Sequence, residues 1–179
     1  ILLGMLQALY PGDPISSGTI NLIYYGIGLL VIFLCFARML RREFDRLCDR
    51  PLQCVYAICA GWCAWYLAMM VISLLTEQFL PDWPDNPANT TMESFHGRDF
   101  RTMKAVAIFL APLVEDPLFR GVAFQSRRKR SRALAYAVSV GLFCIYHVWQ
   151  YAVAWQDPVL LLYALEYIPI TLAITWSYE

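Results

Sequence analysis

The sequence predicts an all-α integral membrane protein, a polytopic bundle of about five transmembrane helices. Of its 179 residues, 59% are hydrophobic and only 16% are charged, which is more apolar surface than a soluble domain could bury. Apolar runs close to the roughly 20 residues that cross a bilayer recur along the chain. Clusters of Arg and Lys separate these runs, as is typical of membrane proteins.

The five expected spans follow one another along the chain. Residues 20–36 and 55–75 are the clearest apolar runs, and residues 133–155 and 158–176 each contain one His or Glu. A span over residues 103–124 is interrupted by the acids and the arginine of APLVEDPLFRG. Residues 1–10 resemble the end of a further apolar segment. We expect residues 1–179 to form a single transmembrane domain.

Two basic segments give the expected orientation, because short segments rich in Lys and Arg stay on the cytoplasmic side. These are residues 38–50 and 127–132. The connection at 76–102 carries five acids against two arginines, and the turn at 156–157 has no base, so both are expected outside. The basic run at 127–132 is interpreted as a topology signal or a contact with anionic lipids, not as a nucleic-acid patch. The expected location is a plasma membrane of bacterial type.

The outer connection is rich in Pro, Asp and Asn, which predicts irregular structure with a surface helix from Ser94 onward. His96 lies in this polar segment and is expected to be structural or solvated. The six cysteines include no C-x-x-C pair, so neither a disulfide framework nor a zinc ribbon is predicted.

Ionisable residues inside the spans are the candidates for chemistry. Each costs about 2.5 to 3.5 kcal/mol to insert, and such residues usually face the bundle interior or a water-filled cavity. The candidates are Glu115, Asp116, Arg120, His147 and Glu166.

On an α-helix, Asp116 and Arg120 share one face, whereas Glu115 points about 100° away from Asp116. The simplest assignment pairs Asp116 with Arg120 and leaves Glu115 as a poorly solvated carboxylate, which suits a general base near neutral pH. The alternative is that all three form a buried ion-pair cluster that holds helices together. Pro117 removes a backbone hydrogen bond and can open a polar pocket.

His147 is expected at a depth that lets it join Glu115. At about 1.5 Å per residue, Glu115 lies roughly 18 Å below the outer start of its span, and His147 lies roughly 12 Å below Trp155. Helix tilt and side-chain length can close this difference. A lone His on an apolar helix is more often structural, but a His level with a buried carboxylate favours catalysis.

Two motifs resemble those of the CPBP family, the type II CAAX prenyl endopeptidases and bacteriocin-processing (Abi) intramembrane proteases. EDPLFRG, residues 115–121, resembles the family signature E-E-x-x-x-R. FCIYH, which runs from Phe143 to His147, resembles the second signature, F-x-x-x-H. The order of the motifs and the single basic segment between them also agree, and the resemblance covers residues 103–179.

The chain departs from the family pattern at two points. Asp116 stands where the family has its second Glu, and no H-x-x-x-N or H-x-x-x-D motif follows on a later helix. The end LAITWSYE resembles the stretch before that last helix, so the chain is expected to stop short of it. Residues 1–179 alone are therefore expected to lack peptidase activity.

The resemblance implies hydrolysis of peptide bonds within the membrane, on a peptide or a lipid-anchored protein. Glu115 would activate a water also held by His147, while Asp116, Arg120 and Phe143 would support them. Two protein ligands are too few for a catalytic zinc, so no metal and no cofactor are expected. Two alternatives are a catalytically idle member that binds partners or confers immunity, and a transporter, for which the expected repeated halves are not seen.

Glu166 is not explained by either motif. It lies eight residues into its span and His147 lies eight residues before Trp155, so across the short turn the two are expected at similar depth. Glu166 is therefore predicted to orient the His147 ring. The alternative is that Glu166 is protonated, or bonds Tyr163 or Tyr167 and only stabilises packing.

Overall fold

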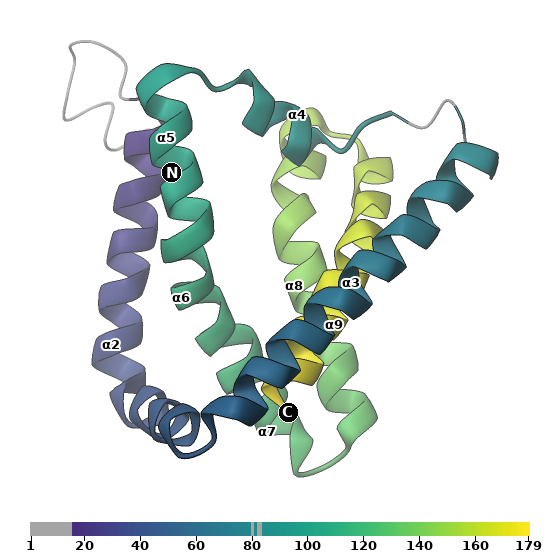
Figure 1. Cartoon of the computed structure of the whole chain (residues 1–179). Helices are drawn as coiled ribbons and strands as arrows, with labels where there is room; N and C mark the ends of the chain where they lie inside the picture. Colours follow the sequence, from purple (N-terminus) through teal and green to yellow (C-terminus); the bar gives the residue numbers. More distant parts are fainter. Residues whose placement is uncertain (1–15, 80, 82–83) are drawn as a thin grey trace. The chain divides into compact units, whose positions relative to one another are not determined.

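The computed structural model describes residues 16–79, 81 and 84–179, and every regular element in them is helical (Figure 1). Within these residues four helical segments are long and apolar enough to cross a membrane: Ser17–Asp49, Pro51–Phe79, Arg132–Trp155 and Pro158–Tyr178. The all-α prediction is confirmed, and these segments contain four of the five expected spans. The apolar segment expected at residues 1–10 lies outside the described residues.

The fifth expected span, over residues 103–124, is helical but not a regular α-helix. It consists of α5 (Gly97–Ala105), the π-helix η1 (Val106–Leu110), α6 (Ala111–Asp116), the π-helix η2 (Pro117–Phe124) and α7 (Gln125–Arg128). Pro117 has no N–H to donate to the Leu113 carbonyl, and η2 begins at this proline. π-helical turns occur frequently at functional sites.

The first basic segment is a helix where we expected a connecting loop. Helix α2 (Ser17–Asp49) continues through it, and α3 (Pro51–Phe79) starts two residues later. Leu40, Phe44 and Leu47 recur at helical spacing among the charged residues, which explains the continuation. The helix is interrupted only at Phe36, whose backbone angles are not helical (φ −120°, ψ 16°).

The connection at residues 76–102 also differs from the expectation. Helix α4 (Pro87–Ser94) ends at the residue where a surface helix was expected to begin, and α5 starts at Gly97. Asn86 favours this earlier start, because its side-chain oxygen accepts a 3.0 Å hydrogen bond from the Ala88 N–H. His96 is exposed and its Nδ1 donates to the Ser94 carbonyl at 2.8 Å, in agreement with a structural or solvated role.

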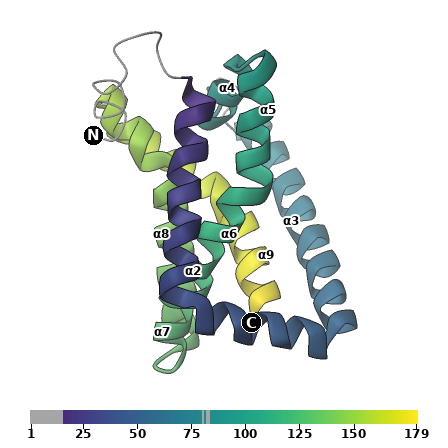
Figure 2. The same ribbon diagram turned by 90° about the vertical axis from the view of Figure 1, so that its left-hand side faces the viewer.

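The described residues divide into two compact units, and the first contains residues 16–37 and 89–117. In it, the first half of α2 packs beside α5 and α6 (Figures 1 and 2). A Cβ at Gly18 would lie 3.1 Å from Asp99, and one at Gly28 would lie 3.1 Å from Val114. The residue numbers rise on both sides from the first contact pair to the second, so α2 runs parallel to the segment formed by α5 and α6. The first and third expected spans should have this parallel arrangement.

The second unit contains residues 38–88 and 118–179. Here α8 (Arg132–Trp155) packs antiparallel to the 3₁₀-helix η3 (Pro158–Tyr167) and to α9 (Ile168–Tyr178). Helix α3 crosses α9 so closely that a Cβ at Gly61 would collide with the hydroxyl of Ser177. That hydroxyl lies 3.0 Å from the Ala57 carbonyl, which ties α9 to α3.

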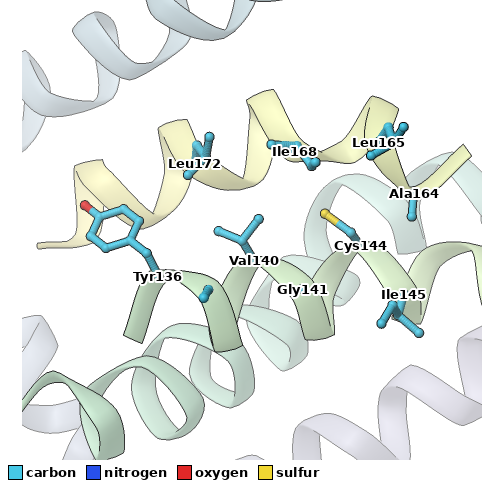
Figure 3. Close-up of a pocket in the computed structure, with 10 residues that line it drawn as sticks. Tyr136, Val140, Gly141, Cys144, Ile145, Ala164, Leu165, Ile168 and Leu172 are labelled. Atoms are coloured by element: carbon cyan, nitrogen blue, oxygen red, sulfur yellow. The ribbon is translucent and has the colours of Figure 1, made fainter. Parts of the chain in front are cut away.

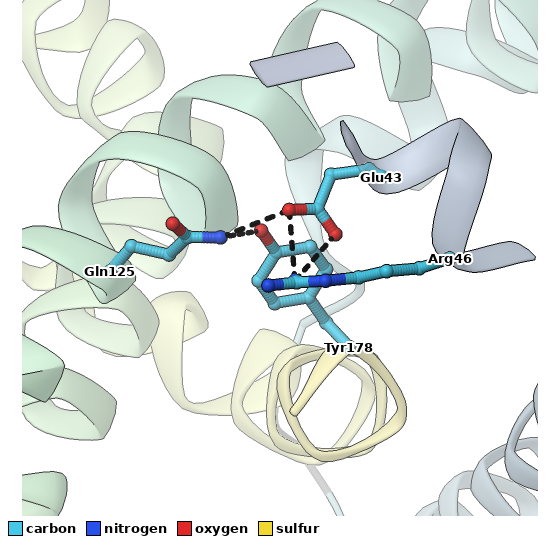
Figure 4. A network of polar contacts seen from close by, with 4 residues as sticks. All are labelled: Glu43, Arg46, Gln125 and Tyr178. Atoms are coloured by element: carbon cyan, nitrogen blue, oxygen red, sulfur yellow. Dashed lines mark hydrogen bonds and ion pairs between the residues drawn. The ribbon is translucent and has the colours of Figure 1, made fainter. Parts of the chain in front are cut away.

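A polar network joins three segments at one end of the second unit (Figure 4). The amide of Gln125 in α7 donates to Tyr178 of α9 and, at 3.2 Å, to Glu43 of α2. Arg46 pairs with the same carboxylate at 3.0 Å. The two basic segments therefore lie at the same end of this unit, as the expected topology requires.

Candidate active site

The predicted site residues are distributed over both units. Glu115 and Asp116 belong to the first unit, and the second contains Arg120 together with Phe143, His147 and Glu166. The joint action of Glu115 and His147 stays a prediction.

Glu115 is a buried carboxylate held by a neighbouring helix. It lies in α6, its residue is only 7% exposed, and Tyr25 of α2 donates a hydrogen bond of 2.7 Å to its Oε1. A charge-assisted bond of this kind fixes the orientation of the carboxylate. Nothing in the sequence around Tyr25 indicated this role, because the two residues are 90 positions apart.

Asp116 and Arg120 flank the change from α-helix to π-helix. Asp116 ends α6, and Arg120 lies inside η2, where hydrogen bonds join residues five apart. The α-helical spacing that put Asp116 and Arg120 on one face therefore does not apply here. The pairing of these two residues stays a prediction. Arg120 is fully buried, at 0% exposure.

The second unit brings Arg120, Phe143 and His147 together in a stack. The Arg120 guanidinium carbon lies 4.4 Å from the centroid of the Phe143 ring. The Phe143 ring in turn stacks on His147, with centroids 4.2 Å apart and planes at 29°. The His147 ring also packs against Tyr167, with centroids 4.8 Å apart. Phe143 thus links the arginine of one motif to the histidine of the other.

Helix α8 is fixed to η2 beside this stack. Ser139 is fully buried, and its hydroxyl donates to the Phe119 carbonyl at 2.8 Å. The Phe119 ring packs edge-on against Phe143, with centroids 5.2 Å apart. These contacts hold the two motif-bearing segments of the second unit at a defined distance.

The protonation pattern of the His147 ring follows from its hydrogen bond. Nδ1 lies 2.9 Å from the Phe143 carbonyl, which can only accept, so Nδ1 carries a hydrogen. In the neutral ring Nε2 then holds a lone pair and can accept a hydrogen bond from water.

Glu166 contacts a different residue from the one expected. Its carboxylate accepts a 2.7 Å hydrogen bond from the side-chain amide of Asn86, a residue only 4% exposed. Its neighbour Tyr167 packs on the His147 ring, and the Phe143 carbonyl binds Nδ1. No contact of Glu166 with His147 appears among the described residues, so its orienting role stays a prediction.

A metal would need several ligands close together. In the described part of the chain, no three side chains of His, Cys, Asp or Glu come together in a way that could hold a metal ion. The prediction that the protein uses no metal stays open to experiment.

Comparison with known proteins finds a family that matches the region with both motifs. Residues 99–179 match the family described as type II CAAX prenyl endopeptidase Rce1-like. This match confirms the resemblance read from the motifs and extends over residues 99–179. No curated protein matches the chain, and no solved structure does.

Proposed function

We propose that the protein is an intramembrane endopeptidase in which Glu115 activates a water molecule for attack on a peptide bond. The observation that supports this most strongly is the buried Glu115 carboxylate, oriented by Tyr25 inside the region that matches the protease family. The stack of Arg120, Phe143 and His147 supports the proposed role of His147, because it fixes the position of the imidazole ring.

The proposed reaction proceeds in two steps. Glu115 takes a proton from water while the water oxygen bonds to the carbonyl carbon of the scissile peptide, and Nε2 of His147 accepts the second water hydrogen as a hydrogen bond. The carbonyl oxygen becomes an oxyanion. Collapse of this intermediate breaks the C–N bond, and Glu115 returns its proton to the leaving nitrogen. The products are a carboxylate and an amine.

The substrate class follows from the family description alone. We propose a peptide or lipid-anchored protein, and the first probe is a prenylated CAAX peptide presented in a bilayer. The full-length protein, reconstituted in vesicles, should release a shorter peptide whose mass identifies the cut. In water labelled with ¹⁸O, the new carboxylate should gain one labelled oxygen. Binding of the peptide without any cut, across a panel of lipidated peptides, would favour an idle binding protein.

The orientation of the protein is part of this proposal. Arg46, Arg128 and Lys129 line one polar cavity together with Gln125, and this proximity supports the proposal that both basic segments lie at one membrane face. We place this face in the cytoplasm, following the charge rule. A cysteine at position 131, introduced in a variant without native cysteines, should react with a membrane-impermeant maleimide only after the cells are opened. Labelling in intact cells would reverse the assignment.

A further inference from the structure

An apolar groove runs between α8 and the segment formed by η3 and α9 (Figure 3). Its volume is about 370 Å³. Tyr136 stands at one end near Leu172, and Ile145 stands toward the other end near Leu165. Both flanking segments are apolar enough to cross a membrane, and Ile145 and Leu165 are more than half exposed. The groove therefore opens toward the lipid phase.

Gly141 helps to form the groove. It lies in the middle of α8, and a Cβ added there would meet nothing within 4 Å. An alanine would therefore fit at this position, and it would stabilise the helix by roughly 0.5 to 1 kcal/mol relative to glycine. Packing within the described residues does not explain why the position is a glycine. The missing side chain leaves room beside Val140 and Cys144 for an external apolar group.

The Tyr136 end of the groove is basic. Arg132 lies one helical turn before Tyr136, and both residues bond the Glu179 carboxylate at 2.9 Å. Arg128 pairs with the same carboxylate. Glu179 balances only one of the two arginines, whose side chains remain 47% and 63% exposed.

The dimensions match one leaflet of a bilayer. From Tyr136 to Ile145 the helix rises about 14 Å, while half of the hydrocarbon core measures about 15 Å. The groove thus offers apolar lining over one leaflet and guanidinium groups at its Tyr136 end.

We propose that the groove binds one acyl chain of an anionic phospholipid whose phosphate lies against Arg128 and Arg132. Arginine suits this role because its planar group presents several N–H donors to phosphate oxygens. The occupant is a lipid of the leaflet at the basic end. Its binding is independent of peptide cleavage.

Native mass spectrometry of the full-length protein tests this proposal, with dioleoyl phosphatidylglycerol and dioleoyl phosphatidylcholine as probes. The wild-type protein should retain the anionic lipid preferentially. The double variant Arg128→Gln with Arg132→Gln should weaken this preference by about fivefold for each arginine removed. The matched control, Arg127→Gln with Arg130→Gln, removes the same charge from the neighbouring positions and should change the preference much less.

The apolar half of the site is tested by filling the groove. Gly141→Leu should reduce retention of both lipids, and thermal unfolding should show that the variant is folded. If it does not fold, Gly141→Ala provides the same test with a smaller expected loss. Equal retention of both lipids by the wild type, or an equal effect of the control pair, would overturn the proposal. So would displacement of the lipid by a prenylated peptide, or a dimer that Gly141→Leu abolishes, since either would identify another occupant.

Discussion

The hydroxyl of Tyr25 donates a hydrogen bond of 2.7 Å to the carboxylate of Glu115. The contact joins α2 to α6 within the first unit, and it gives the first span a role in the site that general hydropathy did not reveal. Without it, a carboxylate that is 93% buried would lose a donor that supports its charge.

Removal of this donor should affect both stability and catalysis. We expect Tyr25→Phe to lower the free energy of unfolding by about 1 to 3 kcal/mol, because the variant loses the charge-assisted hydrogen bond to the buried carboxylate. Peptide cleavage should slow in parallel. Thermal unfolding in detergent and the cleavage assay measure the two effects. Tyr66→Phe is the control, since Tyr66 is 63% exposed. Equal behaviour of the two variants would contradict this role of Tyr25.

The contact between Asn86 and Glu166 gives a second prediction. Asn86→Ala removes the bond to the carboxylate and the bond to the Ala88 N–H, so it should cost about 2 to 3 kcal/mol of stability. Asn89→Ala, at an exposed position of α4, should cost little. Chemical or thermal unfolding compares the two variants. An orienting role of Glu166 for His147 would in addition require Glu166→Gln to change the pH dependence of cleavage.

The close approach of α3 and α9 gives a third prediction. Gly61→Val should destabilise the protein by about 1 to 3 kcal/mol, because the new side chain would displace Ser177 and separate the helices. Gly26→Val is the matched control, since a Cβ at Gly26 meets nothing within 4 Å. Unfolding of the two variants in the same detergent compares them. A stable Gly61→Val protein would show that the two helices do not pack as closely as described.

Glu179 provides a prediction about pH. Burial alone would raise the pKa of its carboxyl, but hydrogen bonds from Tyr136 and Arg132 and the charge of Arg128 bring the pKa below its ordinary value of 4.5. Because the folded protein holds this carboxylate ionised more strongly than the unfolded chain does, its contacts stabilise the fold above pH 4.5. This contribution is lost as the pH falls through the lowered pKa.

The pH prediction is checked by comparing wild type with Glu179→Gln. The melting temperature of the wild type should exceed that of the variant at pH 7, and the difference should shrink as the pH falls below about 4.5. If the difference in melting temperature stayed constant from pH 7 to pH 3, the ion pairs of Glu179 would not be the cause of the added stability.

Sequence patterns predicted the apolar spans well because hydropathy requires no knowledge of packing. They did not predict the π-helices η1 and η2 or the ten residues of 3₁₀-helix in η3, because an apolar run does not distinguish these helix types from an α-helix. The motif residues were found from their chemistry inside spans. Tyr25 and Tyr167 were not assigned to the site, because ordinary tyrosines in apolar helices give no signal until contacts bring them to Glu115 and His147. The helical first basic segment shows that charge indicates orientation without specifying a loop.

Replacement of Glu115 tests the central claim most directly. Glu115→Gln keeps the shape of the side chain and can still accept the Tyr25 hydrogen bond, but it cannot take a proton from water. The full-length variant should remain folded and cleave the prenylated peptide at least about a hundredfold more slowly than wild type. Glu77→Gln, at an exposed position of α3, is the control and should cleave normally. A folded Glu115→Gln protein with the wild-type rate would contradict a glutamate-activated water at this position.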